Sequence, residues 1–202
     1  MVSALAGTGD APPSSEMTIH AIGNTDARLI SPRVHRDGRG AFARSWSADI
    51  FSAAGIDFTP VQGNVSFTRR RGVIRGMHFQ RDPWPDAKIV RCSMGRIWDV
   101  IVDLRPGSEQ FGQPQVRELS CESWVMLYVP PGFAHGFQTL TDHVIVEYLM
   151  GERYVPSAYD GFRYDDPAVA VRWPEPISSI SASDLKWAPL AGRVSGFGSN
   201  DQ

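Results

Sequence analysis

The chain has 202 residues, enough for one domain with a sizeable core, and carries 20 lysines and arginines against 22 aspartates and glutamates. Its formal net charge of −2 provides no basic field that would favour nucleic acid or an anionic membrane as a partner. No apolar run is long enough to span a bilayer. A small molecule is therefore the expected partner, and the two cysteines, Cys92 and Cys121, favour a reducing, cytoplasmic location.

The two ends of the chain differ in composition from the middle. Residues 1–16 are rich in Ala, Gly, Ser, Thr and Pro, lack the pattern of a secretory signal and hold few bulky apolar side chains. We expect a flexible leader there, because such a segment cannot offset the entropy of ordering. Residues 191–202 have the same character and are expected to form a flexible tail. A single folded domain is expected over residues 17–190.

Short strands separated by turn residues dominate the expected domain. One short helix is predicted over residues 47–54, with Ser47 as its N-cap and an aspartate in its first turn. Strands are predicted over residues 72–80, 88–94, 97–104, 116–119, 124–129, 136–139 and 143–150, with Gly and Pro turns between them. This spacing is typical of a β-sandwich or barrel, and the jelly roll is the version that most often encloses a small-molecule pocket.

A carboxylate stands inside the most regular of these strands. Over residues 97–104 the alternation places Asp99 on one face with Ile97 and Ile101. Burying an unpaired carboxylate costs several kcal/mol, so an inward Asp99 requires a histidine or a cation opposite it. The alternative is an aspartate at the strand rim that faces water.

Two histidines occur in glycine-punctuated β contexts. His78 lies in a predicted strand, where a regular alternation gives it the same face as Ile74, Gly76 and Gln80. Its imidazole suits a general base, because the unperturbed pKa of histidine lies near neutrality. The alternative is a core histidine with satisfied hydrogen bonds. His135 follows a Pro-Pro-Gly turn. It is either a second functional histidine or a turn residue whose side chain caps the local backbone.

Three further side chains are weak signals when taken singly. Lys88 begins a strand and suits an ordinary rim charge, whereas Tyr148 shares an apolar face and needs a hydrogen-bond partner if buried. Arg75 ends an arginine-rich stretch that suits either a solvated turn or a phosphate. Arg75 and His78 would face opposite sides of a regular strand, so both can serve one site only if Gly76 marks a bulge or the site wraps a strand edge.

Taken together, these motifs resemble one family. The stretches RGMHFQ (75–80), IWDVIVDLR (97–105), PPGFAHGF (130–137), GFRYDDPAV (161–169) and ISASD (180–184), with a lysine ten residues after the first histidine and a tyrosine thirteen after the second, look like the dTDP-4-dehydrorhamnose 3,5-epimerase family. The resemblance covers residues 29–184 nearly without gaps. It implies an all-β, cupin-type jelly roll that acts as a homodimer, without metal or other cofactor, on a nucleotide-diphosphate 4-keto-6-deoxy sugar.

The resemblance also implies roles for individual residues. His78 matches the family's base, paired with Asp184, and Tyr148 matches the acid on the opposite face of the sugar. Lys88 would place a cation beside the developing oxyanion. The second pair of the family corresponds to His135 and Asp99. Positions that match substrate-binding residues of the family are Arg39, Gln62, Asn64 and Arg75.

Four residues depart from the family pattern. Arg44 and Tyr159 stand where the family normally has glutamates, and Leu149 and Arg153 change the usual pattern around the tyrosine. The resemblance implies that these positions lie near the nucleotide and sugar-positioning side of the site, so the identities of the nucleotide and sugar stay open. Inversion at C3 alone, at C5 alone or at both carbons also stays open.

Rival functions of other classes remain. A metal-dependent cupin oxygenase normally has a second histidine two residues after the first, and Gln80 occupies that position. A non-catalytic sugar-binding jelly roll would need the pocket without the acid, the base and the cation. A 3,4-ketoisomerase on the same fold is disfavoured by RGMHFQ together with Lys88. Metal analysis and loss of turnover in His78→Ala separate the first two from an epimerase.

Overall fold

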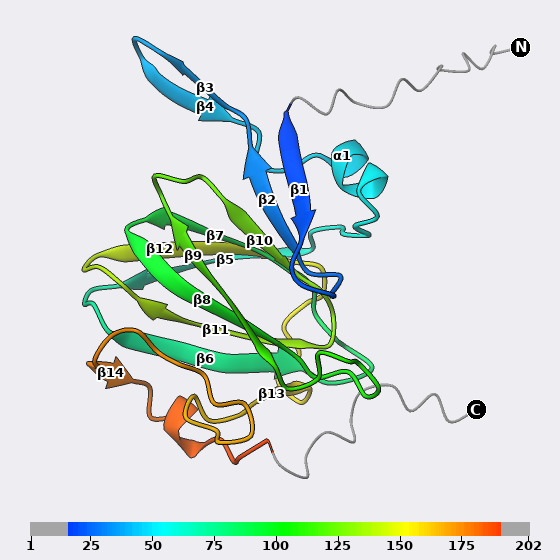
Figure 1. The fold of residues 1–202 in the computed structure, drawn as a ribbon, viewed down its shortest axis with the longest axis vertical. Helices are drawn as coiled ribbons and strands as arrows, with labels where there is room; N and C mark the ends of the chain where they lie inside the picture. Colours follow the sequence, from blue (N-terminus) through cyan, green and yellow to red (C-terminus); the bar gives the residue numbers. More distant parts are fainter. Residues whose placement is uncertain (1–15, 191–202) are drawn as a thin grey trace, which may run out of the picture.

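The computed structural model describes residues 16–190, which form two facing sheets that are antiparallel apart from one short strand (Figure 1). The first sheet contains, in spatial order, β1 (Met17–Ala21), β2 (Arg28–Pro32), β10 (Met126–Val129), β7 (Lys88–Met94), β12 (Val144–Met150) and β5 (Gln62–Thr68). The second contains β13 (Tyr159–Gly161), β6 (Val73–Gln80), β11 (Phe133–Thr139), β8 (Arg96–Asp103) and β9 (Pro114–Ser120), and β14 (Ser179–Ile180) pairs in parallel with β6. The chain crosses repeatedly between the two sheets, which is the expected cupin-type jelly roll.

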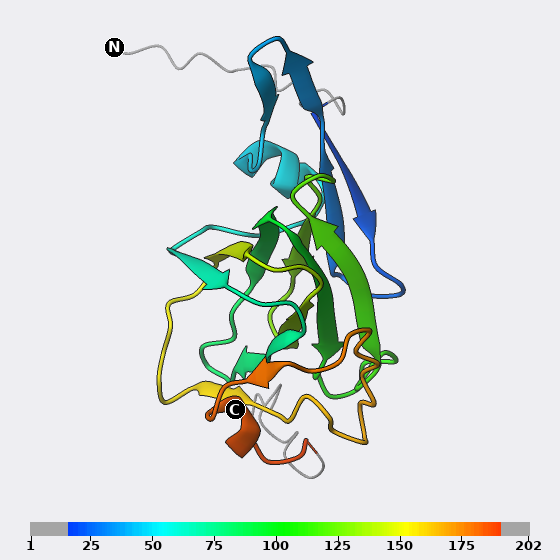
Figure 2. The ribbon, with the colours of Figure 1, turned by 90° about the vertical axis from the view of Figure 1, so that its left-hand side faces the viewer.

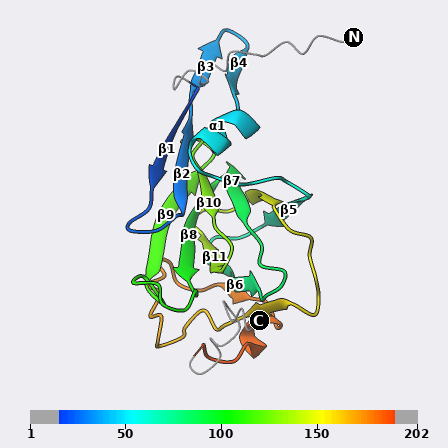
Figure 3. The same ribbon diagram turned by 90° about the vertical axis from the view of Figure 1, so that its right-hand side faces the viewer.

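A two-stranded hairpin and two short helices of the described residues lie outside these sheets. A hairpin of β3 (Val34–Asp37) and β4 (Gly40–Ala43) projects from one end of the body in all three views (Figures 1, 2 and 3). The helices are α1 (Ala48–Ala53) and the 3-10 turn η1 (Asp184–Lys186). Neither is long or apolar enough to cross a membrane.

The strands predicted from the sequence are all present, with shifted ends. Strand β11 begins at Phe133 rather than at residue 136, so His135 lies within a strand and not in a turn. Strand β10 begins at Met126, because Trp124 has a positive φ of 59° that breaks the extended run. The helix is found as predicted, but the Ser47 side chain makes no capping hydrogen bond; only its backbone carbonyl accepts one, from Phe51. The expected flexible ends lie outside the described residues, apart from Glu16.

The alternation predicted for β8 decides how the core is divided. Ile97 and Ile101 point inward and join the apolar cluster between the two sheets. Val100 and Val102 point outward and join a second cluster, which also holds Phe162 of the C-terminal segment. That segment runs over the outer face of the second sheet, and both faces of β8 are therefore buried.

Strand β6 has a bulge at Gly76, which is one of the two alternatives that the sequence allows there. His78 pairs with His135 and Arg75 with Phe137, so β6 advances by one residue more than β11 between these pairs. Gly76 lies in this step with a φ of +138°, a conformation that favours glycine. A side-chain β-carbon on Gly76 would come within 2.5 Å of the Cα of Gly136. The regular alternation predicted for β6 is thus wrong at Gly76, and the bulge turns Arg75 and His78 to the same side.

Candidate active site

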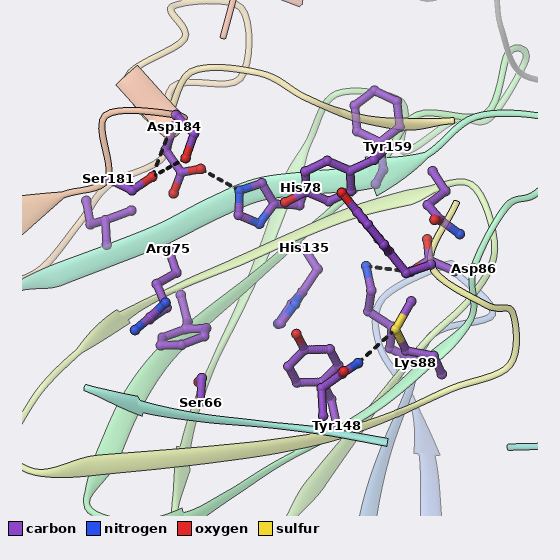
Figure 4. A pocket seen from close by; sticks show the side chains of 18 of the residues that line it. Ser66, Arg75, His78, Asp86, Lys88, His135, Tyr148, Tyr159, Ser181 and Asp184 are labelled. Atoms are coloured by element: carbon purple, nitrogen blue, oxygen red, sulfur yellow. Dashed lines mark hydrogen bonds and ion pairs between the residues drawn. The ribbon is translucent and has the colours of Figure 1, made fainter. Parts of the chain in front are cut away.

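One cavity of about 700 Å³ opens between the two sheets (Figure 4). Side chains from strands of both sheets line it, and the C-terminal segment closes part of one side. Nearly all of the residues singled out from the sequence contribute to its wall. They are Gln62, Asn64, Arg75, His78, Lys88, His135, Tyr148 and Asp184.

His78 is held by a carboxylate from a distant part of the chain. Its Nε2 lies 2.7 Å from Oδ1 of Asp184, which η1 places beside β6. The backbone N–H of Gly76 donates to the other carboxylate oxygen at 3.4 Å. Burial pushes the pKa of Asp184 upward, but the hydrogen bonds and charge interactions, chiefly with His78, outweigh it and hold this pKa below its usual value. Asp184 therefore stays ionised and fixes the orientation of the imidazole.

The second histidine–carboxylate pair lies deeper. Nε2 of His135 is 2.8 Å from Oδ2 of Asp99, and the Asp99 side chain is fully buried. Burial raises the pKa of Asp99, while the interaction with His135 opposes the shift. The partner that an inward Asp99 requires is thus His135, and this part of the sequence prediction is confirmed. His135 lines the cavity, whereas Asp99 stands behind it.

A cation and a phenol complete the wall. Lys88 begins β7, and its side chain is only 9% exposed. Nζ of Lys88 forms an ion pair of 3.0 Å with Oδ2 of Asp86. Tyr148 of β12 points across the cavity towards the side that carries His78 and His135 (Figure 4). Burial raises the pKa of Tyr148, so its hydroxyl is a phenol with a proton to donate.

The residues expected to bind substrate divide into two groups. Gln62 and Asn64 of β5 lie at the cavity and are hydrogen-bonded to each other at 3.2 Å. Arg75 is fixed by a hydrogen bond of 3.1 Å from its Nε to the Thr68 hydroxyl. Arg39 lies elsewhere, on the hairpin, where it pairs with Asp37. Within this chain the structure does not bring Arg39 to the cavity.

Several cavity residues have no role in the sequence prediction, notably Asp86, Tyr154, Tyr159 and Ser181. Tyr159, noted from the sequence only as a departure, packs against His78 with ring centroids 5.4 Å apart. The centroid of the same ring also lies 5.9 Å from that of Trp187 and 5.2 Å from that of Tyr154. Burial, followed by the nearby Asp184 charge, raises the pKa of Tyr159. The aromatic ring thus supports the base, a role that only the three-dimensional packing reveals.

This arrangement is suited to proton transfer. Two imidazoles held by carboxylates, an ammonium group and a protonated phenol surround one space, a set that can remove and return protons at a carbon beside a carbonyl. In residues 16–190 no three His, Cys, Asp and Glu side chains gather as a metal-ligand set. The fold and the site define a jelly-roll isomerase that works by acid–base chemistry.

Comparisons with known proteins agree with this class. Residues 23–192 match the family model for dTDP-4-dehydrorhamnose 3,5-epimerase. The enzyme of that name from Methanothermobacter thermautotrophicus is 41% identical over 167 residues, which are 81% of this chain and 89% of the relative. The chain therefore belongs to the dTDP-4-dehydrorhamnose 3,5-epimerase family and is a nucleotide-sugar epimerase, which confirms the resemblance carried by the motifs.

Two of the similar solved structures share the fold over most of this chain. A dTDP-4-dehydrorhamnose 3,5-epimerase from Bacillus anthracis, with TDP and PPi bound, has a TM-score of 0.82 and 39% identity over 86% of this chain and 99% of its own. ChmJ from Streptomyces bikiniensis, a 3'-monoepimerase in complex with dTDP-quinovose, has a TM-score of 0.77 and 32% identity over 82% of this chain and 84% of its own. The fold is therefore shared by enzymes that invert different numbers of centres.

Proposed function

We propose that this enzyme inverts C3, C5 or both in a dTDP-linked 4-keto-6-deoxy sugar. One observation carries the proposal: the imidazole of His78 and the phenol of Tyr148 face one cavity from different sheets, and Lys88 lines the same cavity at one side of them (Figure 4). Inversion at a carbon needs a base on one face and an acid on the other. The similarity to enzymes solved with TDP and with dTDP-quinovose supports the choice of nucleotide.

In the proposed mechanism, His78 removes a hydrogen α to the C4 ketone. The electron pair of the broken C–H bond moves onto the ketone oxygen and forms an enolate. Asp184 holds His78 in the orientation for abstraction and stabilises the imidazolium that results. Lys88 lies beside the developing oxyanion, where a preorganised charge lowers the barrier by about 3 kcal/mol.

Tyr148 then donates its proton to the same carbon from the opposite face. The carbon is inverted, the enolate returns to the ketone, and the phenolate regains a proton from water while His78 releases one. The raised pKa of Tyr148 supports this role, because the hydroxyl is protonated at neutral pH before each turnover. His135, held by Asp99, contributes a second oriented imidazole to the same wall.

The remaining assignments concern binding. Arg75, Gln62 and Asn64 line the cavity beside the catalytic groups and would contact the sugar and the diphosphate. An arginine fork matches the geometry of phosphate oxygens. A cytoplasmic location is proposed on the two free cysteines, Cys92 and Cys121.

We further propose a homodimer in which the hairpin serves the neighbouring subunit. Strand β5 lies at the edge of the first sheet, and its outward residues Val65 and Phe67 are 71% and 50% exposed. Phe42 of the hairpin is 68% exposed. Exposed apolar side chains on an edge strand favour association. If Arg39 binds substrate, it does so across such an interface, because it stands away from the cavity of its own chain.

The substrate is tested by incubation with dTDP-4-keto-6-deoxyglucose in D2O, followed by NMR. We expect deuterium at C3, at C5 or at both, according to which centres are inverted. The UDP-linked sugar serves as the comparison and should turn over more slowly. Label at neither carbon of either sugar would contradict the proposed function, and stoichiometric iron or zinc in the purified protein would favour a metal-dependent cupin.

A further inference from the structure

Asp86 is a buried carboxylate that the proposed mechanism leaves unused. It lies two residues before Lys88, in the segment between β6 and β7, and both side chains line the cavity. Its side chain is 3% exposed, and its Oδ2 lies 3.0 Å from Nζ of Lys88 (Figure 4). The ion pair therefore joins two side chains that are only two positions apart in the chain.

The ion pair meets a physical need of the site. Burial disfavours the charged form of a lysine, and a buried lysine without an anion loses its proton readily. Between turnovers no enolate faces Lys88. Tyr148 and His135 both line the cavity wall. Asp99 also interacts with the charge of Lys88, but its carboxylate is hydrogen-bonded to His135. Asp86 is therefore the carboxylate that is paired directly with the ammonium group.

The use of lysine at this position is itself informative. The chain contains two lysines, Lys88 and Lys186, and arginine supplies its other basic side chains. An ammonium group is compact and can lose its proton, whereas a guanidinium group cannot. A lysine in a buried cavity therefore needs a neighbour that controls its charge.

We propose that Asp86 is a positioning residue that keeps Lys88 protonated and directs its ammonium group towards the place of the ketone oxygen. The role of Lys88 in turnover rests on the proposed function. The effect of Asp86 on the charge of Lys88 is independent of that function. Before the substrate reacts, the negative charge of Asp86 keeps the proton on the Lys88 ammonium group. When the enolate forms, the ammonium group then interacts with two anions, Asp86 and the enolate oxygen.

The test uses Asp86→Asn, which keeps the shape of the side chain and removes its charge. Protein labelled with 13C at the lysine ε-carbons gives signals from Lys88 and Lys186, and each is followed over a pH titration. We expect the midpoint of the Lys88 signal to move to lower pH in the variant, because the buried ammonium group loses its anion, and that of exposed Lys186 to stay in place. An unchanged Lys88 midpoint would overturn the proposal, whatever the substrate is.

Kinetics provide the second measurement. We expect kcat of Asp86→Asn to fall by roughly 10- to 100-fold at alkaline pH with little change in KM, and its alkaline limit to move to lower pH. Asp86→Glu should restore part of kcat. A rise in KM alone, with the pH profile unchanged, would overturn the positioning role and make Asp86 a substrate-binding group. If no nucleotide sugar turns over, the proposed function fails while the lysine titration still decides the charge effect.

Asp103→Asn is the matched control, because Asp103 is also buried and ion-paired, to Arg105, but lies outside the cavity. This variant should lower the thermal midpoint without moving the titration of Lys88. A shift of Lys88 in both variants would show a general loss of structure and contradict a specific role for Asp86.

Discussion

The two histidine–carboxylate pairs use the same chemistry in different environments. The side chain of His78 is 25% exposed, and the pKa of its partner Asp184 is lowered. Asp99 has no exposed surface, and burial raises its pKa although His135 lies against it. The first pair thus has a fixed anion beside an accessible imidazole, as a general base requires. The second pair is a buried unit whose charge depends on both partners.

Asp184→Asn should leave His78 in place but without an anionic partner. We expect kcat to fall by roughly 10²- to 10⁴-fold with little change in KM, since orientation of a catalytic histidine by a carboxylate has effects of this order. Steady-state kinetics at neutral pH check it. Asp49→Asn, at an exposed helix position, is the control and should behave as the unmodified enzyme. An Asp184→Asn variant with full kcat would contradict the role of the pair.

The Asp184–His78 pair also predicts that the stability of the fold depends on pH. Because the native pKa of Asp184 is below its unfolded value, the carboxylate stabilises the fold above about pH 4, and this contribution is lost as the pH falls through the lower native pKa. The difference in unfolding free energy between the unmodified protein and Asp184→Asn should therefore be largest at neutral pH and shrink in acid. Denaturant unfolding at several pH values measures it; a difference that grows in acid would have the wrong sign.

At the residue scale, the sequence predicts those interactions that follow from the neighbouring residues in the chain. The cost of an unpaired carboxylate among isoleucines is enough to require a partner for Asp99. The partner of His78 is 106 residues away, so only the family resemblance indicates Asp184. Asp86 and Tyr159 carry no local signal, because an aspartate in a proline-rich segment and a tyrosine after a turn are ordinary surface residues until the fold buries them.

At the scale of elements, the bulge in β6 places the catalytic and the binding side chains in one site. Gly76 and Gly136 face each other across β6 and β11, and a β-carbon on either would meet backbone atoms within 3.0 Å. The close approach of these two strands holds Arg75 and His78 in the cavity. The sequence predicts the strand itself from its apolar pattern, but leaves the bulge open, because a glycine in a strand has several structural roles.

Gly76→Ala should disturb both stability and activity. The substitution adds a β-carbon 2.5 Å from the Cα of Gly136 at a φ of +138°, so we expect a loss of about 2 to 4 kcal/mol in unfolding free energy. The remaining folded enzyme should have reduced kcat, because His78 is displaced. Gly38→Ala is the control for the unfolding free energy alone, as its β-carbon meets nothing within 4 Å. Equal stability and kcat in Gly76→Ala and the unmodified enzyme would show that the bulge is not required.

At the scale of the whole molecule, the hairpin that carries Arg39 extends away from the cavity and the rest of the body (Figure 1). The sequence predicts neither strand of this hairpin, because Val34–Asp37 and Gly40–Ala43 are short and mostly exposed. A mostly exposed two-stranded hairpin buries little apolar surface, so its own contacts stabilise it weakly. Packing against a second copy of the chain in a symmetric dimer would bury the hairpin and stabilise it.

Subunit mixing tests this assembly. An Arg39→Ala chain and a His78→Ala chain should each be impaired alone. After joint refolding, half of the dimers are mixed, and each mixed dimer has one cavity with both residues intact, so activity should recover to about a quarter of the unmodified level. If Arg39 serves its own chain, no cavity in the mixture is complete. Absence of recovery in verified mixed dimers would therefore contradict the exchange.

The most direct test of the whole account is isotope exchange in D2O with Tyr148→Phe and His78→Ala, each with the dTDP-linked 4-keto sugar. If a base and an acid work from opposite faces, Tyr148→Phe still takes up deuterium beside the ketone through His78, but the configuration of the carbon is retained. His78→Ala should show neither uptake nor inversion. Inversion at the unmodified rate in Tyr148→Phe, or undiminished uptake of deuterium in His78→Ala, would contradict the account.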